Sequence, residues 1–170
     1  MRYIIAVLLI LWPMQVLAET ELWLVRHAEK QAGLDPALTK TGKSRARVFG
    51  HMFSEQGVTR VFSTHTKRTI QTALPTVERV NGQIEFYDPS KMDALAAMLC
   101  ALNEKTLVVG HSNTTPRVVN AIMGEHLFDD HDEADYDTAY RVTCGGDTPP
   151  QAHKITVQFS SPKDDNDAHD

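Results

Sequence analysis

Leu24-Val25-Arg26-His27-Ala28-Glu29-Lys30 places an arginine and a histidine directly after a short apolar run. The run over residues 21–26 predicts a buried β-strand, because it is apolar and β-branched near its end. In an open α/β sheet, ligands bind at the edge where the parallel strands end. This stretch therefore predicts a strand that delivers Arg26 and His27 to a binding edge.

Two later stretches repeat the arrangement. Residues 60–63 predict a second strand, and Arg68 follows in the opening turn of the next helix. Residues 106–110 predict a central parallel strand, apolar on both faces, with His111 directly after it. The three stretches are thus expected to bring two histidines and two arginines to one edge of the sheet.

The segments around these strands alternate between helical and extended patterns. The expected elements are a helix at 42–55 capped by Thr41, a helix at 66–80 kinked or restarted at Pro75, a strand at 83–87, a helix at 89–102 capped by Ser90, a helix at 115–123 with Pro116 in its first turn, and edge strands at 140–143 and 154–159. This order predicts a three-layer α/β/α fold with a doubly wound, mostly parallel sheet.

The first residues resemble a targeting segment. Residues 1–18 have the layout of a secretory signal peptide, with cleavage expected after Ala18. The alternative is an uncleaved membrane anchor, but the apolar stretch is interrupted by Pro13 and Gln15 and is short for a span of about 20 residues. We therefore expect a secreted or periplasmic protein with no stable membrane insertion after cleavage.

The remaining length suits one domain, expected over residues 19–160, and residues 161–170 form a polar tail that is expected to be disordered. The whole chain has a formal net charge of −5, which makes it a poor general binder of nucleic acid. Any anion site must therefore be local, built from a few converging cations.

Cys100 and Cys144 are the two cysteines of the chain. Export permits a disulfide, and two cysteines in an oxidising compartment commonly pair. The alternative is a buried Cys100 in a helix and a free Cys144 thiol in a loop. Neither cysteine has a neighbouring histidine or lysine that would lower its pKa, so a catalytic role is not expected.

The four basic side chains at the predicted edge suit phosphoryl chemistry. A neutral imidazole such as His27 accepts a phosphoryl group near neutral pH. Arg26 offers a planar fork of donors, and Arg68 lies at a helix N-terminus where backbone N–H groups also favour an anion. Several fixed cations, with His111 among them, match the charge that spreads over three phosphoryl oxygens during transfer.

The chain resembles the histidine phosphatase superfamily, also called the phosphoglycerate mutase-like or histidine acid phosphatase clan, in residues 24–29, 35–42, 63–73 and 108–113. The resemblance implies a phosphoglycerate mutase-like fold and a nucleophilic His27 that carries a phosphohistidine. It implies that Arg26, Arg68 and His111 bind the phosphoryl group and that water then releases phosphate. It requires no metal or other cofactor.

Two positions depart from the family pattern. Ala28 replaces the usual glycine after the nucleophile, and Ser112 occupies a position where some members have an aspartate acid. Asp88, at the end of the third predicted strand, is the best candidate for the general acid, with Glu85 and Asp93 behind it. Asp88 as a capping or turn residue is an equally open interpretation. Without an acid, good leaving groups would be preferred.

Lys30 and Asn113 are further candidates for the phosphate site, as a rim cation and an amide donor; a solvated lysine and a helix cap are the alternatives. The acidic stretch 128–137 is expected to be a solvated loop without a calcium-binding pattern. The short connection between the third and fourth strands leaves little room for a cap domain, so an open pocket and a bulky phosphorylated substrate (glycolipid or phosphoprotein) or a small ester are expected.

The leading hypothesis is an exported phosphatase acting on phosphomonoesters or related phosphoryl groups. A catalytically silent phosphate-binding or envelope interaction domain is the alternative from another class. A phosphomutase is the third interpretation, although no residues for holding a turning product are evident.

Overall fold

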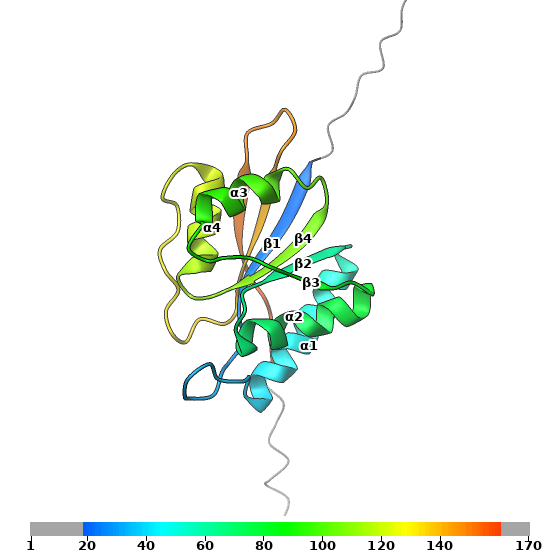
Figure 1. Ribbon diagram of the computed structural model, residues 1–170, viewed down its shortest axis with the longest axis vertical. Helices are drawn as coiled ribbons and strands as arrows, with labels where there is room; N and C mark the ends of the chain where they lie inside the picture. Colours follow the sequence, from blue (N-terminus) through cyan, green and yellow to red (C-terminus); the bar gives the residue numbers. More distant parts are fainter. Residues whose placement is uncertain (1–18, 161–170) are drawn as a thin grey trace, which may run out of the picture.

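The computed structural model describes residues 19–160, so the predicted signal peptide and polar tail lie outside the described residues. Within that range the chain forms six strands in one sheet, and four helices cover the sheet (Figure 1). The elements are β1 (Thr20–Arg26), α1 (Lys40–Glu55), β2 (Arg60–Ser63), α2 (Lys67–Val80), β3 (Ile84–Phe86), α3 (Met92–Cys100), β4 (Lys105–Gly110), α4 (Thr114–Met123), β5 (Thr138–Cys144) and β6 (Gln151–Thr156). Over 19–160, no helix is long and apolar enough to cross a membrane.

The sheet has the strand order β3-β2-β4-β1-β5-β6. The first four strands in this order are parallel, and β5 and β6 add an antiparallel edge next to β1. The expected three-layer, mostly parallel α/β fold is confirmed. The central strands β1 and β4 are buried along almost their whole length, which is why their middle residues, 22–25 and 107–109, are all apolar.

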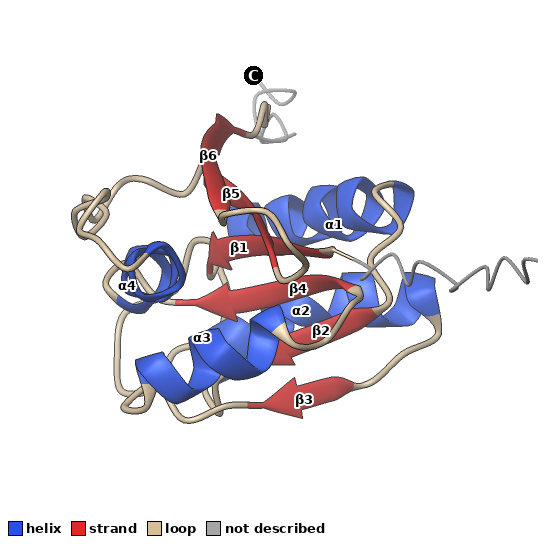
Figure 2. Cartoon of the chain, turned by 90° about the horizontal axis from the view of Figure 1, so that it is seen from above, coloured by secondary structure: helices blue, strands red, loops and turns tan. Residues whose placement is uncertain are grey.

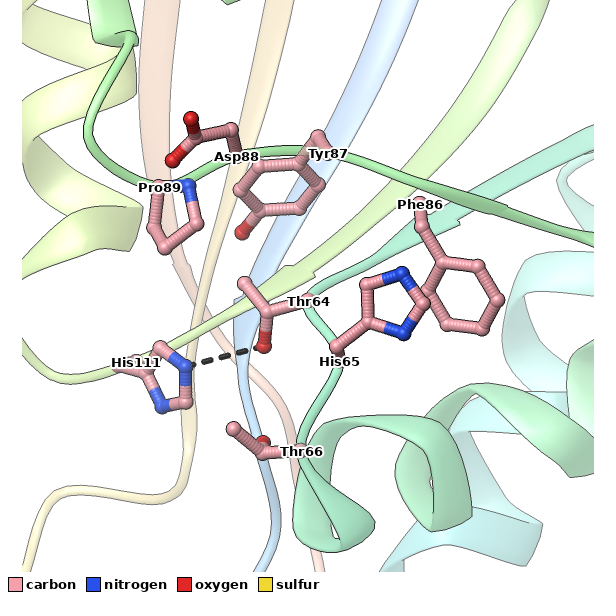
Figure 3. A pocket seen from close by; sticks show the side chains of 8 residues that line it. All are labelled: Thr64, His65, Thr66, Phe86, Tyr87, Asp88, Pro89 and His111. Atoms are coloured by element: carbon pink, nitrogen blue, oxygen red, sulfur yellow. Dashed lines mark hydrogen bonds between the residues drawn. The ribbon is translucent and has the colours of Figure 1, made fainter.

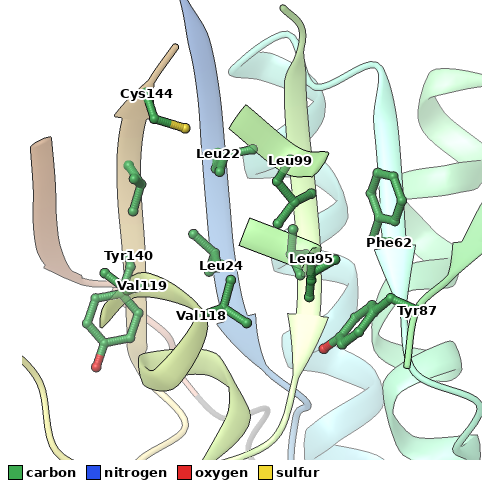
Figure 4. Packing of buried hydrophobic residues seen from close by; sticks show 12 residues of the cluster. Leu22, Leu24, Phe62, Tyr87, Leu95, Leu99, Val118, Val119, Tyr140 and Cys144 are labelled. Carbon is green, nitrogen blue, oxygen red and sulfur yellow. The ribbon is translucent and has the colours of Figure 1, made fainter. Parts of the chain in front are cut away.

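Helices α1 and α2 cover one face of the sheet, and α3 and α4 cover the other (Figure 2). Alternate residues of β1 separate the two cores: Leu22 and Leu24 pack beneath α3 and α4, while Trp23 and Val25 pack against α1. Figure 4 shows the first of these cores. Because both faces are filled, only the ends of the strands remain open to a ligand.

The beginnings of two helices differ from expectation. Thr39, not Thr41, caps α1, since its Oγ1 accepts the Gly42 N–H at 3.0 Å. Helix α3 begins at Met92 rather than at 89, because the Asp88 carboxylate accepts the Ser90 N–H at 2.9 Å and forms a turn there. The predicted Ser90 cap is therefore wrong.

Helix α2 continues through Pro75. The proline lies against Gly50 of α1, where a Cβ would lie 2.8 Å from the Pro75 carbonyl carbon. A larger residue at position 50 would push the two helices apart. The proline is thus accommodated at a close helix contact and does not restart the helix.

The antiparallel edge is longer and shifted relative to the sequence prediction. Strand β5 extends over 138–144 because it pairs with β1 from Thr20↔Cys144 to Val25↔Ala139. Strand β6 covers 151–156 instead of 154–159, in register with β5. The alternation of apolar and polar residues predicted extended structure in this segment. It did not predict the register, which is determined by the pairing with β1.

Cys100 at the end of α3 and Cys144 at the end of β5 are joined by a disulfide, with their Cα atoms 5.3 Å apart. The bond links the last turn of a helix on one face to an edge strand of the sheet. It closes a loop of 44 residues that includes β4 and α4.

Replacing both cysteines by alanine should lower the free energy of unfolding by about 4 kcal/mol, because a loop of this length then regains its freedom in the unfolded chain. Denaturant unfolding of wild type and Cys100→Ala/Cys144→Ala measures the difference. A reducing agent should bring the wild type down to the double variant and leave the variant unchanged; an unchanged midpoint for the wild type would contradict the expectation.

Candidate active site

The site lies where β1 and β4 end side by side. Arg26 is in register with Gly110, and the His27 N–H donates to the Gly110 carbonyl at 2.9 Å. After this point the chain from β1 passes to α1 on one face of the sheet, and the chain from β4 passes to α4 on the other. The divergence opens a crevice at the strand ends, the usual ligand position in such sheets.

The crevice holds a cavity of about 650 Å³. Six of the predicted site residues line it together: Arg26, His27, Lys30, Arg68, His111 and Asn113. The rings of His27 and His111 lie edge to face, with their centroids 5.5 Å apart. The two histidines and two arginines that the sequence placed at one edge therefore meet in one cavity.

His27 is oriented by the backbone beside it. Its Nδ1 lies 2.8 Å from the carbonyl oxygen of Ala28, and because a carbonyl only accepts, the Nδ1 of a neutral ring carries the proton. The lone pair is then on Nε2. Burial, together with the charges of Arg26, His111 and Arg68, lowers the pKa of His27 to about 3. The His27 ring is therefore unprotonated at neutral pH, with a free lone pair on Nε2.

Ala28 fits without the freedom of glycine. It is completely buried, and it is not among the described residues with positive φ. Its N–H donates to Thr72 Oγ1 at 3.0 Å, and Thr72 in turn donates to the Arg68 carbonyl at 2.8 Å. The departure from the family pattern at this position therefore leaves the nucleophile's backbone unstrained and tied to α2.

Arg26 is held by the acidic loop that the sequence predicted to be solvated. Its Nη1 donates to the carbonyls of Asp132, Glu133 and Asp135 at 2.9, 3.0 and 3.1 Å, and its Nη2 donates to the Glu133 carboxylate at 3.2 Å. Its guanidinium also lies 4.3 Å from the centre of the Tyr136 ring. The segment is a loop with mostly exposed acidic side chains, as expected, but its backbone also fixes the first arginine of the site.

Arg68 and His111 form a second unit. The Nη2 of Arg68 lies 3.3 Å from His111 Nδ1, and Thr64 Oγ1 lies 3.0 Å from His111 Nε2. A guanidinium only donates, so Nδ1 accepts and the proton of a neutral His111 lies on Nε2. Burial, with the charges of Arg68 and Arg26, lowers the pKa of His111 to about 4.

The two arginines keep donors free. The Nε atoms of Arg26 and Arg68 are buried, and neither has a hydrogen-bond partner among the described residues. A buried donor without a partner is costly, the more so on a charged group. An anion in the cavity would satisfy both atoms and compensate two positive charges. These unpartnered donors are the strongest indication of the ligand's charge.

Asp88 lies apart from this group. It lines a neighbouring cavity, and in Figure 3 its carboxylate points away from His111. Hydrogen bonds from the Ser90 hydroxyl and N–H lower the pKa of this exposed carboxyl, with a further contribution from Lys91. An ionised carboxylate has no proton to give, so the geometry favours the turn role over the acid role.

Of the four weaker candidates, Lys30 and Asn113 lie in the site, whereas Glu85 and Asp93 do not. Lys30 and Asn113 both line the phosphate cavity, and Asn113 stands at the N-cap position of α4 without a side-chain cap bond. Glu85 pairs with Arg60 at 2.6 Å, and Asp93 lies in the first turn of α3. Neither reserve carboxylate lines the cavity.

Several supporting residues were missed from the sequence. Thr64, Thr72 and Tyr136 were not distinguished from ordinary polar or aromatic positions. Arg45 was missed as well: it is buried in α1, forms a 2.8 Å ion pair with Glu29 and contacts Asp137. It thereby ties the loop after His27 to the end of the loop that holds Arg26. One pattern in the sequence could have indicated a supporting residue: the polar run Thr64-His65-Thr66 directly after a predicted strand.

The described chain thus has a three-layer α/β fold whose strand ends carry a cavity lined by two histidines and two arginines. The model of the histidine phosphatase superfamily (branch 1) matches residues 22–89, which include Arg26, His27 and Arg68. The match is a similarity to this superfamily over 68 of the 170 residues of the chain. His111 lies outside the matched segment and joins the site through the structure. No curated protein sequence matches the chain.

Solved structures share the fold at low sequence identity. A protein assigned as the phosphohistidine phosphatase SixA from Agrobacterium tumefaciens superimposes with a TM-score of 0.58 at 17% identity, covering 84% of this chain and 98% of its own. A SixA assignment from Nakamurella multipartitia gives 0.57 at 20% identity, with 83% and 96% coverage. The mycobacterial glucosyl-3-phosphoglycerate phosphatase gives 0.58 at 11%, with 83% and 99% coverage.

The two site histidines should remain neutral far below the usual titration range. In an NMR titration without phosphate, we expect the imidazole signals of His27 and His111 to shift only near pH 3 and pH 4. Saturating phosphate should raise both pKa values, because a bound anion stabilises the imidazolium form. Titration of either ring near 6.5 in the phosphate-free protein would show that its burial and cationic surroundings are misassigned.

Proposed function

We propose that this protein is a phosphatase that hydrolyses a phosphomonoester or a related phosphoryl substrate through a phosphohistidine on His27. One observation carries the proposal: an unprotonated His27 Nε2 shares a cavity with two arginines whose buried Nε donors lack partners among the described residues. A nucleophile beside two cations with unpartnered donors fits a dianionic phosphoryl group. The superfamily match and the phosphatase names of the structural neighbours support the same activity.

In the first step, His27 Nε2 attacks phosphorus. The N–P bond forms, the bond from phosphorus to the leaving group breaks, and the leaving group departs with the electron pair. Arg26, Arg68 and His111 stabilise the charge that spreads over the phosphoryl oxygens. The Nδ1–H of His27, held on the Ala28 carbonyl, stabilises the positive charge that the ring gains.

In the second step, water attacks phosphorus on the opposite side from His27. The N–P bond breaks, its electron pair returns to Nε2, and the proton released by water leaves with phosphate or solvent. The ring regains its starting tautomer because the Ala28 carbonyl still accepts from Nδ1. The same cationic groups hold the phosphoryl group throughout, so no rearrangement of the site is needed between steps.

The leaving group must depart with little protonation from the protein. Asp88 is exposed and ionised, and it lies outside the phosphate cavity. Leaving groups that are stable as anions, or substrates such as phosphoramidates and acyl phosphates, are therefore favoured over sugar alcohols.

The substrate can be large. One short helix, α3, makes up most of the connection between β3 and β4, so no cap covers the strand ends in the described part of the chain. We extend the proposal to a phosphorylated small ester, glycolipid or phosphoprotein. Among the structural neighbours are proteins named as a phosphohistidine phosphatase and as a glucosyl-3-phosphoglycerate phosphatase, which supports keeping both kinds of phosphoryl substrate in the proposal.

Turnover of p-nitrophenyl phosphate between pH 4 and 8 should be detectable in the wild type and fall by at least about a thousandfold in His27→Ala, because the covalent route is lost. His51→Ala, on the exposed face of α1, is the matched control and should keep wild-type rates. Rapid quenching should trap acid-labile phosphate on His27.

Equal background rates in wild type and His27→Ala would contradict the proposal and favour a silent phosphate-binding domain. Turnover without an acid-labile label would instead contradict the covalent mechanism alone.

We further propose that the protein is exported, as the sequence of residues 1–18 indicates. The disulfide between Cys100 and Cys144 supports an oxidising compartment, where such bonds persist. Export also separates the enzyme from cytoplasmic metabolites, so its substrate would be an extracytoplasmic phosphoryl compound.

When the full chain is produced in a bacterium with a general secretion pathway, the recovered protein should begin at Glu19. Amino-terminal sequencing and intact mass measure this directly. Ala18→Tyr should block cleavage and leave the longer form, because signal peptidases require a small residue before the cut. Cytoplasmic recovery of the wild type with an intact amino terminus would refute export.

A further inference from the structure

A second cavity of about 490 Å³ lies beside the phosphate cavity. The two cavities share His111 and Pro89, so a ligand held by its phosphoryl group at the first reaches directly into the second. Figure 3 shows the second cavity, with its walls from the end of β2, the segment after β3 and His111. A group attached to a phosphoryl group in the first cavity can therefore extend into the second.

Two polar groups of this cavity are already hydrogen-bonded within the protein. The Tyr87 hydroxyl donates to the Val109 carbonyl at 3.2 Å, and the Thr64 hydroxyl lies 3.0 Å from His111 Nε2. Burial raises the pKa of Tyr87 well above its usual value, so its ring stays uncharged. What remains for a ligand is mostly carbon: ring faces, methyl groups and the Pro89 ring. Such a wall favours an apolar partner.

One wall is a preformed aromatic stack. The rings of His65 and Phe86 lie nearly parallel, with centroids 3.8 Å apart and planes inclined by 17°. Phe86 is 46% exposed, which is unusual for a phenylalanine in a folded domain. Because the two rings already hold each other, a third ring can pack against them with little loss of side-chain freedom.

The charge of the cavity excludes an anionic leaving group. None of its lining residues in the described chain is a lysine or arginine, and its one carboxylate, Asp88, is exposed at the rim. A second phosphate or carboxylate on the substrate would find no cation here and would face Asp88. A flat, uncharged ring needs no compensating cation and is not repelled by the Asp88 carboxylate.

Resting on the proposed phosphatase function, we propose that this cavity selects substrates whose leaving group is an uncharged aromatic ring, with Phe86 and His65 as the residues that determine specificity. An aromatic alcohol also leaves readily without an acid, since a phenol has a pKa of about 10. The site chemistry and the cavity thus select the same class of ester.

Binding of phosphonates tests the cavity without turnover. Benzylphosphonate and methylphosphonate carry the same charged group and differ by a ring. Isothermal titration of the His27→Ala protein should show benzylphosphonate about tenfold tighter, the gain expected from covering a ring face. Phe86→Ala should reduce the ratio to within about twofold, whereas Leu74→Ala, a similarly exposed apolar residue of α2, should keep it.

Kinetics provide the second measurement. In the otherwise unchanged protein, Phe86→Ala should lower kcat/KM for 1-naphthyl phosphate about tenfold and leave that for ethyl phosphate within about twofold. Comparing the two substrates within each variant cancels their different intrinsic reactivities. Inhibition by inorganic phosphate should not change, because phosphate occupies only the first cavity.

The outcomes separate the two proposals. Equal affinities for the two phosphonates, or a ratio that Phe86→Ala leaves unchanged, overturns the aromatic cavity even when p-nitrophenyl phosphate is hydrolysed. A ring-dependent affinity without any turnover upholds the cavity and overturns the phosphatase.

Discussion

The parallel pairing of β1 with β4 is the constraint on which the site depends. Register places Arg26 opposite Gly110, and the His27 N–H closes the ladder on the Gly110 carbonyl. The next residue on each strand is a histidine. Position 110 also requires glycine, because a Cβ there would lie 2.8 Å from Thr115 Oγ1 and 3.0 Å from the Tyr87 hydroxyl. A one-residue slip would send one imidazole to the opposite face of the sheet.

Holding two arginines in a buried crevice is costly, and the protein offsets that cost unevenly. Carbonyl dipoles from the loop after α4 surround the outer nitrogens of Arg26, whereas both Nε atoms stay without partners. The hydrogen bonds that are made hold the guanidinium groups in place. The donors that have no partner still attract an incoming anion. A protein with a net charge of −5 can in this way hold a locally cationic site.

The sequence predicted most of what short-range chemistry determines. Apolar runs mark β1, β2 and β4, and a residue that directly follows a strand must lie at its end, so His27 and His111 were placed correctly. The partners of Arg26 lie 106 to 109 residues away, and nothing local in an acidic loop indicates that its carbonyls turn inward. The sequence left the role of Asp88, as general acid or turn residue, open for a related reason. It locates a carboxylate near a strand end but does not determine the direction in which the carboxylate points.

The low pKa of His27 affects the two chemical steps in opposite ways. A less basic nitrogen is a weaker nucleophile toward phosphorus, but it is also a better leaving group when water attacks the phosphohistidine. The low value comes from burial and from the charges of Arg26, His111 and Arg68, which outweigh the hydrogen bond from Nδ1 to the Ala28 carbonyl. A bound phosphoryl dianion compensates those cations and restores basicity to Nε2 at the moment of attack, because an opposite charge favours the protonated form. The charge that departs with phosphate then resets the ring to its neutral state.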